Sequence, residues 1–133
     1  MSWLTDLIET PPLSFVYGGR ASAELLATWK RDDTQEGRLR HTRWIDPTTG
    51  LQVVAYVRTF ADFPAVDWVV EFVNAGMRNT PILEQILPID LHVPMEAAEH
   101  ARLHHANGSL CQIDDFLPLL TELKPGRPLT LTP

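Results

Sequence analysis

The central part of the chain alternates between apolar and polar positions with a period of two, as β-strands do when one face covers a core. The segment 51–60 places Leu51, Val53, Ala55 and Val57 on one face and Gln52, Val54, Tyr56 and Arg58 on the other. The segment 66–73 places Val66, Trp68, Val70 and Phe72 on one face and Asp67, Val69, Glu71 and Val73 on the other. We therefore predict two neighbouring antiparallel strands, with the Trp68 face buried in the core.

A turn signal precedes this pair of strands. Asp46–Gly50 combines a proline, which presets φ, with a glycine, which accepts the positive φ that closes such a turn. The segment Leu39–Ile45 also alternates, and we expect it to pair with residues 51–60 across the turn. The result is an antiparallel meander of at least three strands.

The N-terminal part carries weaker signals. Ser2–Glu9 is expected to form one or two helical turns, stopped by Pro11, and residues 13–17 read as a first strand. Ser22–Arg31 fits either a helix or a buried extended segment, so both alternatives stay open. The charged segment Arg31–Gly37 is predicted to be a turn.

The C-terminal part is predicted to contain two further strands separated by irregular segments. Ile82–Val93 reads as a long strand with Pro88 at an edge or a bulge, because proline cannot donate a ladder hydrogen bond. Pro94–Arg102 is expected to be a loop or one helical turn, and Ile113–Leu120 a loop. Leu129–Pro133 reads as a last strand at which the chain stops.

These elements predict an all-β fold and a single domain over residues 1–133. No helices of ten or more residues alternate with the strands, so a parallel sheet is not expected. We predict an antiparallel β-sandwich.

Composition excludes several classes of function. The net charge of −6 argues against nucleic acid as a partner, since no basic stripe could offset the phosphate charge. No stretch approaches the roughly 20 apolar residues of a membrane helix, and the acidic N-terminus is no secretory signal. The single Cys111 forms no intrachain disulfide and suits a reducing compartment. We therefore expect a cytoplasmic protein.

The histidines were considered as metal ligands. On a helix, His100 and His104 would share a face as a zinc-binding pair does, with His105 beside them. The Asn107-Gly108 turn signal that follows favours a loop or strand instead. We interpret these histidines as surface or structural residues and expect no metal and no cofactor.

The most conspicuous acidic pair is Asp114-Asp115. Two carboxylates of a glycosidase must face each other across a bond, roughly 5–9.5 Å apart, whereas adjacent residues of an extended segment point in opposite directions. The pair is therefore not a catalytic acid and nucleophile. One of these aspartates is expected to brace a loop, and the alternative is that the loop presents a carboxylate to a ligand or a neighbouring domain.

Four tryptophans are available for packing or for stacking on a sugar. Trp68 is assigned to the core, and Trp29 is interpreted as a buried structural residue. Trp44 fits either role. Asp114, Asp115 and Trp44 are thus our candidate substrate-binding residues, and no catalytic residue is predicted.

Several short motifs occur in an order that resembles one family segment. The motifs are Leu13–Gly19, Ser22–Lys30, Asp46–Val53, Asp62–Val69, Thr80–Glu84, His104–Cys111 and Asp114–Leu119. Each is short, but together they resemble the N-terminal β-sandwich domain of α-galactosidase-like enzymes of glycoside hydrolase family thirty-six. The resemblance covers nearly the whole chain, from about Leu13 onward.

The resemblance implies a non-catalytic domain whose antiparallel β-sandwich is of the supersandwich type and would be left incomplete by the end at Pro133. In that family a (β/α)₈ barrel follows the sandwich and carries the two carboxylates of a retaining mechanism. This chain would then be a fragment or a freestanding relative of such a hydrolase, meeting the α-galactoside through the parent enzyme. Its roles would be structure, assembly and the rim of the active site.

Two other classes of function stay open: an autonomous carbohydrate-binding module and a protein–protein assembly domain. A sandwich that ends at Pro133 would leave an apolar face or a strand edge uncovered. We therefore expect a homo-oligomer that pairs through the last strand or through Ile82–Val93.

Overall fold

A computed structural model describes residues 2–92, 101–108, 111–124 and 126–131, without the side chains of residues 2–5. The chain divides into two compact units, Met1–His92 (unit 1) and Val93–Pro133 (unit 2). The two units are described separately. All strand pairing in both units is antiparallel, so the predicted all-β antiparallel class is confirmed.

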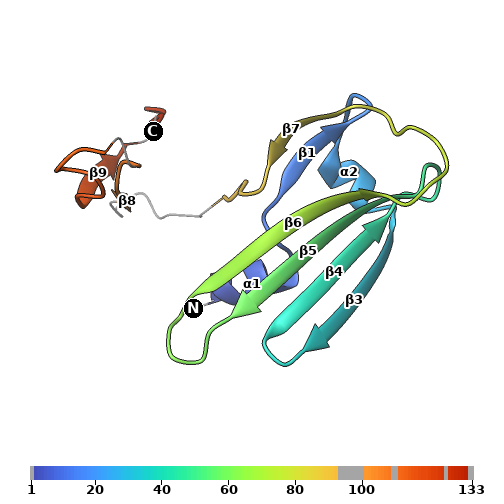
Figure 1. Cartoon of the computed structure of the whole chain (residues 1–133), viewed down its shortest axis with the longest axis horizontal. Coiled ribbons are helices and arrows are strands. Elements are labelled where there is room, and N and C mark those ends of the chain that lie inside the picture. Colours follow the sequence, from blue (N-terminus) through green and yellow to red (C-terminus); the bar gives the residue numbers. More distant parts are fainter. Residues whose placement is uncertain (1, 93–100, 109–110, 125, 132–133) are drawn as a thin grey trace. The chain divides into compact units, whose positions relative to one another are not determined.

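The larger sheet of unit 1 is a four-stranded meander in the order β3-β4-β5-β6 (Figure 1). Its strands are β3 (Lys30–Glu36), β4 (Leu39–Ile45), β5 (Leu51–Thr59) and β6 (Val66–Asn74). The predicted pairing of β4 with β5 and of β5 with β6 is confirmed. Strands β3 and β6 form the two edges.

The second sheet of unit 1 has the order β2-β1-β7. It consists of β1 (Ser14–Tyr17), β2 (Arg20–Ala21) and β7 (Leu83–Leu87). Unit 1 also contains two short helices, α1 (Ser2–Glu9) and α2 (Ser22–Leu26). Helix α1 was predicted. For residues 22–26, where a helix and an extended segment were both open, the structure has a helix.

The core lies between the two sheets. The ring of Phe15 on β1 meets Phe72 of β6 edge-on at 5.2 Å, and Tyr17 meets Trp29 edge-on at 5.7 Å. Val53 and Ala55 of β5 are fully buried in this layer. The inward face of β5 is therefore the one that the alternation predicted, and the two sheets form the predicted sandwich.

The turn between β4 and β5 is held by the buried side chain of Asp46. Its Oδ1 accepts a hydrogen bond from the Thr48 amide (2.9 Å), and its Oδ2 accepts bonds from the hydroxyls of Thr49 (2.5 Å) and Tyr17 (3.2 Å). Gly50 has φ +81°, as the turn prediction requires. Burial by itself raises the pKa of Asp46, but these hydrogen bonds outweigh it and lower the pKa below its usual value.

The prediction of a turn over Arg31–Gly37 was wrong. These residues form β3, which pairs with β4 along its whole length, and the turn is confined to residues 37–38. An edge strand needs no apolar stripe, because cross-strand ion pairs such as Asp32–Arg43 and backbone bonds hold it. Charged residues also protect an exposed edge from pairing with another chain.

The depth predicted for the Trp68 face was also wrong. Trp68 and the other inward residues of β6 are only half-buried, although they lie on the predicted face. The reason is that β6 is an edge strand. The indole Nε1 of Trp68 donates a hydrogen bond to the Pro88 carbonyl (2.7 Å) rather than sitting in the aromatic core.

Two predicted strands are shorter or absent. The strand expected over Ile82–Val93 ends at Leu87, directly before Pro88, and Gln85 interrupts its alternation with φ +48°. Residues 127–131, which include most of the predicted last strand, have no strand structure. Most of the predicted Pro94–Arg102 loop lies outside the described residues, and its last two residues belong to a strand.

In the part of unit 2 that the structure describes, β8 (Ala101–His105) and β9 (Leu119–Leu123) form an antiparallel pair. The loop predicted over Ile113–Leu120 therefore ends earlier than expected, at residue 118. Across the pair, His105 Nε2 and Thr121 Oγ1 share a hydrogen bond of 3.0 Å.

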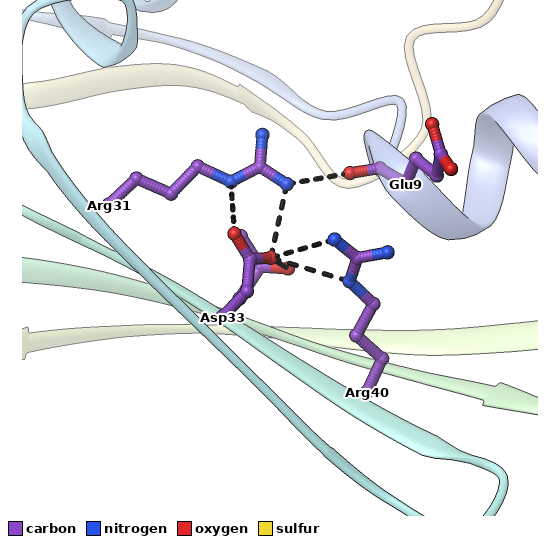
Figure 2. Close-up of polar contacts among 5 residues, drawn as sticks. Glu9, Arg31, Asp33 and Arg40 are labelled. Atoms are coloured by element: carbon purple, nitrogen blue, oxygen red, sulfur yellow. Dashed lines mark hydrogen bonds and ion pairs between the residues drawn. The ribbon is translucent and has the colours of Figure 1, made fainter.

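On the inner face of the four-stranded sheet, α1 is tied to the edge strand by a polar network (Figure 2). Asp33 on β3 accepts hydrogen bonds from Arg31 (2.8 and 3.1 Å), Arg40 (3.0 Å) and Thr42 (2.7 Å). Arg31 also donates to the Glu9 carbonyl at the end of α1 (2.8 Å). Partial burial raises the pKa of Asp33, but these bonds lower it to about 2.

This network predicts acid sensitivity. A carboxyl group whose pKa is lower in the folded than in the unfolded chain stabilises the folded chain at any pH above its unfolded pKa of about 4. That contribution is lost as the pH falls toward 2, the pKa of Asp33 in the folded chain. The Asp33→Asn variant lacks the contribution. We expect the difference in free energy of unfolding between the wild type and Asp33→Asn, measured by urea denaturation, to shrink between pH 4 and pH 2.

Asp62→Asn, in the exposed connection between β5 and β6, is the matched control for removing one carboxylate. A difference between the wild type and Asp33→Asn that stays constant from pH 7 to pH 2 would contradict this prediction.

Candidate functional site

The outer face of the four-stranded sheet carries side chains that alternate with those of the core. The strand register places Asp32, Arg43, Val54 and Glu71 side by side in one row that crosses all four strands. Thr34, His41, Tyr56 and Val69 form the next row. Both rows are set by the hydrogen-bonded ladders, so the spacing of these side chains depends on strands rather than on loops.

These rows border a concave groove of about 410 Å³, which we call the outer-face groove. The polar and aromatic residues that matter for its chemistry are Asp32, His41, Arg43, Gln52, Tyr56 and Glu71. Val54 forms its floor and is only 8% exposed, because the longer side chains around it cover it. The groove therefore has an apolar floor with polar walls.

An aromatic pair stands in the groove. His41 on β4 and Tyr56 on β5 are directly opposite in the register, and their rings meet at 4.7 Å with an interplanar angle of 69°. The His41 Nε2 is out of contact with solvent and has no hydrogen-bond partner among the described residues. A buried ring nitrogen without a partner is unusual in a folded protein and is costly unless a further group completes its bonding.

Charges in the groove are mostly paired. Asp32 lies 3.2 Å from the Arg43 guanidinium and 3.4 Å from the Lys30 ammonium. The Tyr56 hydroxyl donates a hydrogen bond to Glu71, and this bond raises the pKa of Tyr56 above its usual value. The arrangement offers acceptors and donors at fixed positions with little net charge.

The sequence contained part of the signal for this groove. The alternation placed Gln52 and Tyr56 on the outward face of β5 and Glu71 on that of β6. It did not align them with Asp32, because β3 was predicted to be a turn. His41 and Arg43 were not singled out, since nothing local distinguishes them from other outward residues of a strand.

The structure places the candidate Trp44 inside unit 1. Its ring is 4% exposed, on the inward face of β4, with the Arg31 guanidinium carbon 5.4 Å from the ring centroid. Of the two roles left open for Trp44, the structure therefore places it in the core. Trp29, at 7% exposure, is buried as predicted.

Asp114 and Asp115 belong to a turn of unit 2. The Asp115 carboxylate accepts a hydrogen bond from the Gln112 amide (3.0 Å), and the Leu117 amide donates to the Asp114 carbonyl (3.3 Å). Asp115 therefore braces its loop, as we expected of one member of the pair. The Asp114 side chain is exposed.

Of the histidines considered as metal ligands, His100 lies outside the described residues. His104 is exposed on β8, and His105 is bonded to Thr121. Within the ranges that the structure describes, no three histidine, cysteine, aspartate or glutamate side chains gather as a metal site would require.

No helix in the described part of the chain is long and apolar enough to cross a membrane. Comparison of the sequence with protein-family models and with curated proteins, and of the structure with solved structures, finds no match.

Proposed function

We propose that this chain is a non-catalytic β-sandwich domain of an α-galactosidase-like glycoside hydrolase of the cytoplasm, serving structure, assembly and the rim of the active site. The observation that carries the proposal is a set of contacts. Residues from separate motifs of the family resemblance contact one another in a single region of unit 1.

The contacts join four of the motifs. Tyr17 from the first motif packs edge-on against Trp29 of the second and donates a hydrogen bond to Asp46 of the third. The Gly18 amide donates to the carbonyl of Ile82 in the motif Thr80–Glu84 (3.1 Å). These contacts support the proposal because they give residues of four motifs structural roles in one packed unit.

The spacing of carboxylates supports a non-catalytic role. Asp32 and Glu71 are the two acids of the outer-face groove, and they lie three strands apart in one row. With about 4.8 Å between neighbouring strands, the backbone positions of Asp32 and Glu71 lie roughly 14 Å apart. A retaining or inverting glycosidase holds its two carboxyl groups roughly 5–9.5 Å apart, a range narrower than this backbone spacing.

We expect the purified 133-residue chain to release no nitrophenol from p-nitrophenyl α-galactoside above the buffer blank. A retaining α-galactosidase assayed in parallel is the positive control. Turnover that disappears on Asp32→Asn, Glu71→Gln, Asp114→Asn or Asp115→Asn would refute the non-catalytic role. Reading the coding region beyond Pro133 tests the family itself, for which we expect a (β/α)₈ barrel.

We also propose that the chain associates with copies of itself. The segment around β7 exposes Ile82, Ile86, Ile89 and Leu91, each more than 40% exposed, and such a cluster favours burial against a partner. Sedimentation equilibrium at micromolar concentration is expected to give a dimer or larger. Ile86→Glu and Ile89→Glu should shift it toward monomer, whereas a wild type that stays monomeric at high concentration would contradict this.

A further inference from the structure

The polar groups of the outer-face groove are carried by paired strands. Gln52, Tyr56 and Val54 come from one strand, and Arg43 and Glu71 from its two neighbours. Side chains carried by paired strands keep their spacing better than those on loops. Such a groove can recognise a ligand by the positions of its hydrogen-bonding groups.

Charge restricts the class of ligand. The groove holds two carboxylates, Asp32 and Glu71, and one guanidinium, Arg43, which already pairs with Asp32. A phosphate or sulfate would meet no unpaired cation of the groove, since Lys30 at its border also pairs with Asp32. An organic cation would have Glu71 as its main partner. A neutral ligand with many hydroxyl groups fits this balance best.

The aromatic pair restricts the class further. A sugar ring has an apolar face, which stacks on an aromatic side chain, and a rim of hydroxyls, which needs donors and acceptors at its edge. Tyr56 is partly exposed, and its hydroxyl is held by Glu71, while Arg43, on the strand position opposite Val54, and Gln52 both lie toward the Leu51 end of β5.

We propose that the outer-face groove binds a short neutral carbohydrate. One sugar ring stacks on Tyr56, and hydroxyls of the carbohydrate bind Gln52, Arg43 and Glu71. The groove volume of about 410 Å³ falls in the range of roughly 300–1,000 Å³ that is typical of small-molecule sites. The inference rests on the groove alone, so it stands or falls independently of the proposed membership of a hydrolase.

The test is a titration of the ¹⁵N-labelled 133-residue chain followed by amide chemical shifts. The probes are three neutral trisaccharides, maltotriose, cellotriose and raffinose, with trigalacturonic acid as the charged comparison. At least one neutral probe is expected to shift the amides of β4 and β5 near Arg43 and Tyr56. Tyr56→Ala should weaken this binding at least about tenfold, and Gln52→Ala and Glu71→Gln should each weaken it severalfold.

Arg58→Ala is the matched control, because Arg58 lies on the same face of β5 but does not line the groove. It should bind as the wild type does. Gln52→Ala and Glu71→Gln keep the test informative if Tyr56→Ala fails to fold. The proposal is overturned if no neutral probe shifts these amides, if trigalacturonic acid binds more tightly, if the folded groove variants bind as the wild type does, or if self-association covers the groove.

Discussion

Replacing Trp44 by alanine is expected to lower the free energy of unfolding of unit 1 by about 3–5 kcal/mol, because the indole is nearly fully buried and a large cavity would remain. The same change removes the stacking partner of the Arg31 guanidinium, which ties β3 to α1. Urea denaturation followed by far-ultraviolet circular dichroism measures the loss.

Trp68→Ala is the matched control for the loss of a tryptophan. Trp68 is half-buried on an edge strand and makes one hydrogen bond, to Pro88. We expect it to cost about 1–2 kcal/mol. A loss for Trp68→Ala equal to that for Trp44→Ala would show that the β6 edge is covered in solution and that Trp44 is not the main indole of the core.

Asp46→Ala is expected to destabilise unit 1 by about 2–3 kcal/mol, since its buried carboxylate accepts hydrogen bonds from the Thr48 amide and from the hydroxyls of Thr49 and Tyr17. Asp46→Asn should cost less, because the amide oxygen can still accept from Thr48. Thermal and urea unfolding of both variants at pH 7 measure the two effects.

Asp62→Ala serves as the control, because this aspartate lies in an exposed connection. It should change the free energy of unfolding by less than about 0.5 kcal/mol. If Asp46→Ala also falls below that value, the turn between β4 and β5 holds without its carboxylate. Tyr17 would then be anchored by Thr49 and by its packing against Trp29.

The errors in the sequence prediction share a physical cause. The charged residues 31–36 lack an apolar stripe, and without one a strand cannot be told from a turn by its own pattern. Their strand structure comes from pairing with β4. For Trp68, the alternation indicated the correct face but not the depth, because depth depends on whether a second layer covers that part of the sheet.

The candidate site could not be predicted for the same reason. Asp32, Arg43, Val54 and Glu71 are far apart in the sequence, and only the register of three ladders places them in one row. By contrast, one member of the pair Asp114-Asp115 was expected to brace its loop, and this expectation required no knowledge of distant residues. The structure assigns the role to Asp115.

The sequence by itself determined the antiparallel meander from β4 to β6, the turn at Asp46–Gly50 and the inward face of β5. Each of these follows from a local cause: the period of two along a strand, the fixed φ of proline, or the positive φ of glycine. Only the tertiary structure decided that β3 is a strand, that Trp44 is buried while Trp68 is half-buried, and that the outer-face groove exists. These features depend on which strands pair and which faces are covered, and contacts between distant residues set both.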